Sequence, residues 1–250
     1  MKNLIRGDIR RIMCKKSLWV AFIAAILVNI LLIAFYLSSM KNSSFNYMLG
    51  NLDGMGDIGG MIVGIAVFLA VYSDDFKSLT IVSIIGRGNT RLHIIIAKFI
   101  NSVIITFILY AIFAFQVLVM TKVIGVELMP DERLALCLGV FRGIYITIGY
   151  VNMAAIVIYA TGNNAFSVFM LVMFYLIIPN VLPFTSNLPV VKNIHLERYD
   201  YNGLCANGLT NIILGMKFRG VMILISSFII YVGASILIIF KVFNKKELDF

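Results

Sequence analysis

Two long apolar runs, residues 18–37 and 221–240, constrain this chain most, because neither contains a charged residue. Each run matches the ~20 residues that an α-helix needs to cross the hydrocarbon core of a bilayer. Across the chain 61% of the residues are hydrophobic and 13% are charged, whereas a soluble domain is roughly half apolar and a quarter charged. A single soluble core of this length cannot bury that surplus, so we expect lipid to surround the protein.

Charge breaks divide the rest of the sequence into further apolar runs. Together with the first two they predict an all-α integral membrane protein with six spans, at about 18–37, 56–72, 92–121, 134–160, 166–184 and 221–240. The first run is longer than the apolar part of a cleaved signal peptide, so we expect it to remain in the protein. No linker or low-complexity tract divides the chain, which indicates one transmembrane domain over residues 1–250.

The basic residues predict the orientation of these spans. Most of the 21 Lys and Arg residues lie in segments that share one side when the N-terminus is cytoplasmic, and cytoplasmic loops are rich in Lys and Arg. We therefore expect both termini on the inner side of a cell membrane, as a multi-pass protein. The net charge of +9 then faces anionic lipid headgroups rather than nucleic acid.

Residues 2–16 predict an amphipathic helix before the first span. Its apolar side chains gather on one face at helical spacing, and the opposite face carries Arg6, Arg10 and Arg11. Such a helix lies along the inner interface of the bilayer. Two interpretations stay open: it is a topological anchor, or it is also a surface that docks a cytoplasmic partner.

A second cytoplasmic helix is predicted over about 74–86, between the second and third spans. Ser73 can cap its start, and Asp74 and Asp75 then fall in the first turn, where the helix dipole favours acids. Gly86 and Gly88 can end it, and Asn89 or Thr90 can cap the next helix. The segment is too long for a tight turn, and its apolar side chains need a cover that lipid, the bundle itself or a soluble subunit could provide.

At these residues the chain resembles the permease subunits of ABC transporters of the ABC-2 type. The resemblance lies in the acidic–aromatic segment Asp74, Asp75 and Phe76, in Arg91 followed by Lys98 at the head of the third span, and in the tail 240–248. Six spans, an amphipathic N-terminal helix and a proline-broken connection after the fifth span agree with it. The chain departs from the family at Leu79–Thr80, where a Gly–Thr pair is common.

The resemblance implies a dimeric exporter of the bacterial cytoplasmic membrane, with two ATPase subunits and a second copy of the permease. The ATPase-coupling residues would be Asp74, Asp75, Phe76, Lys77, Leu79 and Thr80, with Arg6, Arg10 and Arg11 on the neighbouring interface helix. The sequence has no phosphate-binding loop of the G-x-x-x-x-G-K-[ST] type. We therefore expect ATP and magnesium on a separate ATPase, and no cofactor, metal site or enzymatic activity in this chain.

The cargo implied by the resemblance is an amphipathic, antimicrobial-type peptide. Permeases of this compact length resemble those of bacteriocin immunity and export and the exporters of phenol-soluble modulins. An exporter of a drug or of a lipid-linked substrate is an open alternative within the superfamily. From a different class, an ATP-independent secondary transporter or channel is also a chain of several apolar spans, but it is expected to carry more ionisable residues near the midplane.

Polar residues inside the predicted spans are candidates for lining a translocation path, because desolvating them is costly. The candidates are Asn29, Asn101, Gln116, Arg142 and Asn152. The alternative for each amide is a hydrogen bond between helices. Arg142 is either a buried cation near Asp53, Asp57 or an anionic cargo group, or an anchor at the interface. Glycines spaced by four, such as Gly139 and Gly143, predict close helix contacts within the chain or between two copies.

Overall fold

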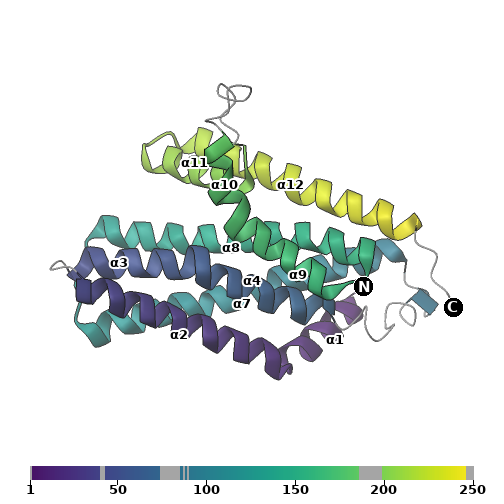
Figure 1. Cartoon of the computed structure of the whole chain (residues 1–250), viewed down its shortest axis with the longest axis horizontal. Helices are drawn as coiled ribbons and strands as arrows, with labels where there is room; N and C mark the ends of the chain where they lie inside the picture. The colour runs from purple at the N-terminus through teal and green to yellow at the C-terminus, as the bar shows by residue number, and fades with distance from the viewer. Residues whose placement is uncertain are drawn as a thin grey trace.

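The computed structural model describes residues 2–39, 43–73, 85–86, 88, 90–185 and 199–245. This part of the chain is helical and contains no strand. Figure 1 shows an elongated bundle in which the long helices run side by side. The all-α class predicted from the apolar runs is confirmed for the described residues.

The helices have the following bounds. They are α1 Lys2–Met13, α2 Lys16–Ser39, α3 Ser43–Asp53, α4 Gly59–Phe68, α7 Arg91–Ile124, α8 Pro130–Thr161, α9 Asn164–Val172, α10 Ile178–Thr185, α11 Tyr201–Ile213 and α12 Lys217–Lys245. Three π-helical turns, Gly54–Ile58, Leu69–Ser73 and Met173–Ile177, continue α3 into α4, extend α4, and join α9 to α10. The helical path is therefore unbroken from Ser43 to Ser73 and from Asn164 to Thr185.

Five helical segments among the described residues are long and apolar enough to cross a membrane: Lys16–Ser38, Arg91–Ile124, Pro130–Thr161, Asn164–Leu182 and Lys217–Lys245. The first, third, fourth and sixth predicted spans lie entirely within these segments. The fifth, 166–184, lies within Asn164–Leu182 except for its last residues. The predicted second span, 56–72, falls on the shorter apolar segment Gly59–Ser73 and on the π-turn before it. Its glycine-rich approach is helical, and the helical path begins at Ser43, before the predicted start of the span at residue 56.

The core of the bundle is built from α2, α4, α7 and α8, with α9 packed on α8 and α4. Helix α1 packs against α7. The start of α7 contacts the end of α12, because Arg91 lies over the Phe243 ring, 5.2 Å from its centroid, and donates to the Phe243 carbonyl. One end of the bundle therefore holds α1, the start of α7 and the last turn of α12 (Figure 1).

Helix α11 was not predicted, because the sequence pattern indicated that residues 185–220 form a loop on the outer side between the fifth and sixth spans. It forms an antiparallel hairpin with α12, and both helices pack on α8 (Figure 1). The Tyr201 ring stacks on Tyr145 of α8 at 4.7 Å between centroids. Its hydroxyl donates to the Tyr145 carbonyl at 3.0 Å. A Cβ at Gly149 would lie 2.1 Å from the Tyr201 ring, so only glycine leaves room for this contact.

Local signals at the start of α7 behave as predicted. Thr90 caps the helix by accepting from the His93 backbone N–H at 3.3 Å. Gly88 adopts a left-handed φ of 84°, which suits glycine best because it has no Cβ. Gly88 and Thr90 therefore mark the point at which α7 begins.

Glycines with spacing of four make contacts inside the chain. A Cβ at Gly139 would lie 2.4 Å from the Leu52 side chain, one at Gly143 would lie 2.4 Å from Tyr110, and one at Gly64 would lie 3.1 Å from Tyr175. Each glycine therefore lets a large side chain of a neighbouring helix approach closely. These contacts confirm the interpretation of these glycines as packing sites within one chain.

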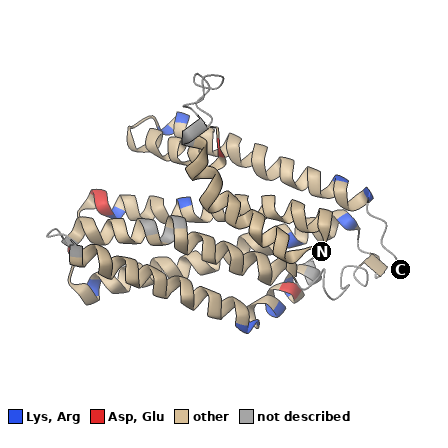
Figure 2. Cartoon of the chain, in the orientation of Figure 1, with Lys and Arg blue, Asp and Glu red and all other residues tan. Residues whose placement is uncertain are grey.

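Charged side chains are distributed unevenly along the bundle. Figure 2 shows most of them toward its two ends, with long uncharged stretches of helix between. Large apolar side chains are exposed along these stretches, among them Leu31 at 69%, Phe115 at 66% and Leu237 at 69%. An exposed apolar belt of this kind is the surface that a bilayer covers.

Candidate functional site

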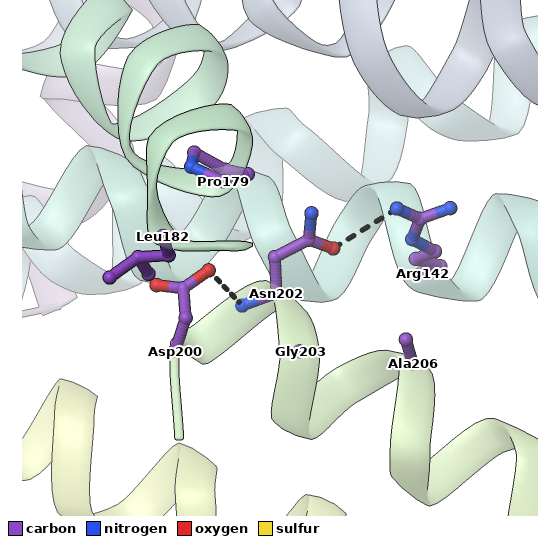
Figure 3. Close-up of a pocket in the computed structure, with 7 residues that line it drawn as sticks. All are labelled: Arg142, Pro179, Leu182, Asp200, Asn202, Gly203 and Ala206. Carbon is purple, nitrogen blue, oxygen red and sulfur yellow. Dashed lines mark hydrogen bonds between the residues drawn. The ribbon is translucent and has the colours of Figure 1, made fainter. Parts of the chain in front are cut away.

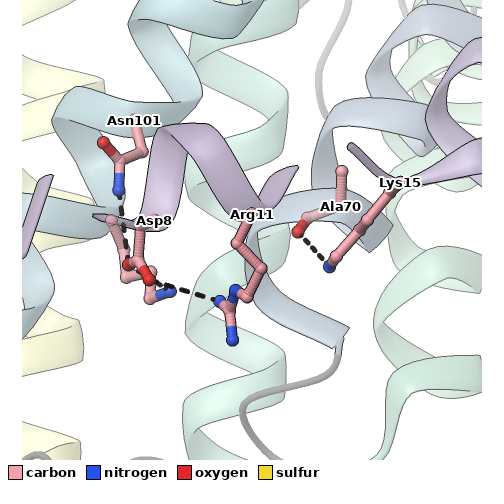
Figure 4. Close-up of polar contacts among 6 residues, drawn as sticks. Asp8, Arg11, Lys15, Ala70 and Asn101 are labelled. Carbon is pink, nitrogen blue, oxygen red and sulfur yellow. Dashed lines mark hydrogen bonds and ion pairs between the residues drawn. The ribbon is translucent and has the colours of Figure 1, made fainter. Parts of the chain in front are cut away.

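A buried ion pair attaches the N-terminal helix to the bundle. The Asp8 carboxylate of α1 accepts from Lys98 Nζ of α7 at 2.8 Å, and both residues are buried, at 8% and 2% exposure. The same carboxylate accepts from Asn101 Nδ2 at 3.4 Å and pairs with Arg11 at 3.4 Å. Figure 4 shows these groups converging on Asp8. A charge that is buried needs such partners, because desolvation alone is costly.

A second contact fixes the short link after α1 to the apolar helix that precedes the predicted coupling segment. Lys15 Nζ donates to the Ala70 carbonyl at 2.6 Å (Figure 4), and Trp19 Nε1 donates to the Met13 carbonyl at 2.8 Å. Ala70 lies in the π-turn Leu69–Ser73, directly before residue 74. Helix α1 and the short link after it, residues 14–15, therefore together touch both helices that flank residues 74–90.

The predicted coupling residues Asp74, Asp75, Phe76, Lys77, Leu79 and Thr80 lie outside the described residues. Only Ile85 and Gly86 of the predicted helix 74–86 are described, and both are helical. The predicted interface residues Arg6 and Arg10 are exposed on α1, and Arg11 is partly buried beside Asp8. The helix ends at Met13 rather than at residue 16.

The five candidate path-lining residues do not meet at one place. Asn29 of α2 is fully buried, and its Nδ2 donates to Gln116 Oε1 at 3.2 Å and to Asn51 Oδ1 at 3.4 Å. Asn101 is fully buried beside Asp8, and Asn152 is 2% exposed within α8. This burial favours hydrogen bonding between helices over lining a path for Asn29 and Asn101.

Arg142 occupies a different setting. It lies in α8 about 18 Å along the axis from Pro130, at ~1.5 Å per residue. Its Nη2 donates to Asn202 Oδ1 of α11 at 3.0 Å, so the side chain bridges two helices. The side chains of Asp53 and Asp57, its predicted partners, lie outside the described residues.

Arg142 and Asn202 line a cavity together with Asp200, which caps α11. The cavity has a volume of about 130 Å³ and is lined by Arg142, Pro179, Leu182, Asp200, Asn202, Gly203 and Ala206. Figure 3 shows the Asp200 carboxylate and the Asn202 amide on one side of α11, facing α10 and α8. Asp200 Oδ2 accepts from the Asn202 backbone N–H at 3.3 Å. Burial raises the pKa of the Asp200 carboxyl, and backbone donors at the start of α11 oppose part of that rise.

Two acids of these sites, Asp8 and Asp200, were not singled out from the sequence. A signal for Asp8 was present, because it follows Ile5 by three residues and precedes Ile12 by four, which places it on the apolar face of α1. Its partner Lys98 lies 90 residues away in the sequence. Asp200 carried only the weaker signal of an acid before an unrecognised helix.

The sequence matches no protein-family model, and no curated protein matches it. Among the described residues no group of His, Cys, Asp and Glu side chains is arranged to hold a metal ion.

Proposed function

We propose that the chain is the membrane-spanning subunit of an ATP-driven exporter of the ABC-2 type, working as a dimer with separate ATPase subunits. Its cargo would be an amphipathic peptide of the antimicrobial class. The observation that carries the proposal is the attachment of residues 2–15, α1 and the short link after it, to the helices on both sides of residues 74–90. A force applied to that segment reaches α7 through the chain and α1 through the Asp8–Lys98 pair.

The geometry supports a coupling role in a specific way. Helix α1 exposes Arg6 and Arg10, while its inward face is fixed to α7 by Asp8. Directly after the helix, Lys15 donates to the Ala70 carbonyl. A partner docked on residues 74–86 would therefore meet α1 as a second, rigidly attached surface. Rigid attachment matters because packed side chains, salt bridges and rigid helices carry coupling between distant sites.

The cargo proposal rests on the cavity beside Arg142. It combines polar side chains with apolar neighbours inside a bundle whose outer surface is apolar. An amphipathic molecule needs both kinds of contact along its route. An exporter of a drug or of a lipid-linked substrate would use the same coupling segment, residues 74–86, with a different cargo. The cargo and the contact with the ATPase are therefore tested in separate experiments.

Leu79→Asp is expected to reduce the recovery of an ATPase subunit with the tagged chain by at least tenfold. A carboxylate placed in an apolar docking surface stays desolvated and unpaired, which is costly. The measurement is co-purification from membranes that contain both subunits, followed by ATP hydrolysis. Val123→Asp is the control, because Val123 is 73% exposed near the opposite end of α7. Equal recovery of the ATPase with both variants would refute the coupling segment.

A further inference from the structure

Two cavities meet at Arg142 and differ in character. The first is the polar cavity of about 130 Å³ that Asp200 and Asn202 line (Figure 3). The second has a volume of about 260 Å³ and lies between the Leu52–Gly56 stretch, α8 and α11. Arg142 and Ala206 line both. The remaining walls of the second cavity are mostly aliphatic, with Leu138, Leu209 and Ile213 among them.

The Arg142 guanidinium lies close to Gly56 at the border of the second cavity. A Cβ at Gly56 would lie 3.9 Å from Arg142 Nη1, which is ordinary van der Waals contact. The neighbouring Gly139 has no room for a Cβ, because Leu52 would lie 2.4 Å away. The guanidinium therefore lies at the junction of a polar and an apolar compartment, held by Asn202 on one side.

The polar compartment presents one cation, one anion and one amide. A ligand that satisfies it must carry a donor cation for Asp200 next to an acceptor oxygen for Arg142 and Asn202. A lysine ammonium does not meet this requirement, because no acceptor oxygen lies beside it. The N-terminus of a peptide does, because its α-ammonium and its first carbonyl oxygen are neighbours.

Depth distinguishes a peptide from a resident phospholipid. A zwitterionic headgroup such as phosphoethanolamine carries the same pair of charges, but headgroups stay in the interfacial layer of the bilayer. Arg142 lies about 12 Å along α8 from Leu134, where the predicted fourth span begins, at ~1.5 Å per residue. A lipid with its headgroup at that depth would leave the interface, whereas a cargo molecule on its way through the bundle would pass this level.

We propose that the two cavities bind the N-terminal end of an amphipathic peptide. The α-ammonium pairs with Asp200, the first carbonyl oxygen accepts from Arg142 or Asn202, and the first apolar side chains enter the cavity beside Leu138 and Leu209. This inference rests on the proposed function, because it specifies the part of the cargo that the exporter recognises. It concerns this chain alone and needs no ATPase.

The test is equilibrium binding to the purified full-length chain in lipid nanodiscs of phosphatidylcholine. The probe is a labelled amphipathic helical Leu/Lys peptide with a free N-terminus, compared with the same peptide acetylated at its N-terminus. Binding is followed by fluorescence anisotropy. We expect the free peptide to bind about tenfold tighter than the acetylated one, because acetylation removes a charge-assisted hydrogen bond.

Asp200→Asn separates recognition from folding. Asparagine caps helices about as well as aspartate, so α11 is retained, and the preference for the free N-terminus is expected to disappear while acetylated peptide binds as before. Asp131→Asn is the matched control, because Asp131 is an exposed acid in the first turn of α8, and it should keep the preference. A full preference in Asp200→Asn, or an equal loss for both peptides, would overturn the proposal.

Ala206→Phe gives a second, independent outcome. Ala206 is exposed and lines both cavities, so a large ring there blocks their junction without entering the core. Binding of both peptides should weaken at least tenfold, and unchanged binding would overturn the site. If phosphatidylethanolamine in the nanodisc displaces the peptide from the wild-type chain but not from Asp200→Asn, the site is a lipid site and the peptide assignment is wrong. The proposed function fails separately, through loss of ATPase association, so the two failures are distinguishable.

Discussion

Lys98→Met is expected to destabilise the folded chain by about 3–5 kcal/mol, because it leaves the buried Asp8 carboxylate without its closest cation. Lys98 is 2% exposed and its Nζ lies 2.8 Å from Asp8 Oδ2. Arg11 stays 3.4 Å from the same carboxylate, but its side chain is partly exposed, so it replaces only part of the lost contact. The free energy of unfolding is measured in mixed micelles by titration with a denaturing detergent.

The double variant Asp8→Asn with Lys98→Met shows whether the loss comes from the pair. Replacing both partners removes the unpaired charge, so the double variant should recover a large part of the lost stability. Lys122→Met, an exposed lysine near the other end of α7, is the control and should change stability by less than about 0.5 kcal/mol. Additive losses in the double variant would mean that Asp8 and Lys98 do not interact.

Gly220→Ala is expected to cost about 2–3 kcal/mol and to separate α11 from α12. A Cβ at Gly220 would lie 2.5 Å from the Gly208 carbonyl oxygen and 3.0 Å from the Ile212 backbone nitrogen. Backbone atoms of a packed helix cannot move aside as a flexible side chain can, so the helices must shift apart, and overpacking of this kind is destabilising. The measurement is again unfolding in mixed micelles.

The same helix offers a matched control for this substitution. Gly233 lies in α12 with no neighbouring atom within 4 Å of an added Cβ. Gly233→Ala should therefore be neutral, or stabilise by up to ~1 kcal/mol through helix propensity. Identical stabilities for the two variants would show that α11 and α12 do not approach each other at Gly220.

The lengths of the apolar runs predicted most of the long helices correctly, because a helix that crosses a bilayer needs ~20 apolar residues. The run 18–37 lies inside Lys16–Ser39, and the run 221–240 lies inside Lys217–Lys245. The second span was harder to delimit, because helical structure begins at Ser43 in a polar, glycine-rich stretch. Its π-turn at Gly54–Ile58 keeps the helix continuous from α3 into α4, so the helical path begins before the predicted start of the span at residue 56.

The candidate site was only partly predictable, because its partners are distant in sequence. Arg142 was identified as a polar residue inside an apolar run, but Asn202 lies 60 residues away in a helix whose pattern is mostly small and polar. Helix α11 exists because Tyr201 fits against Gly149 and Tyr145, and that is a tertiary contact. Asp8 could have been identified from its place on an apolar helix face, but its pairing with Lys98 could not.

The most direct test of the account is transport by the purified chain in liposomes. A labelled amphipathic peptide is followed across the membrane with the chain alone, with the chain and the ATPase subunit recovered with it, and with both plus ATP and magnesium. We expect the peptide to move only in the last condition. Movement of the peptide down its gradient through the chain alone, with no ATPase present, would contradict this expectation.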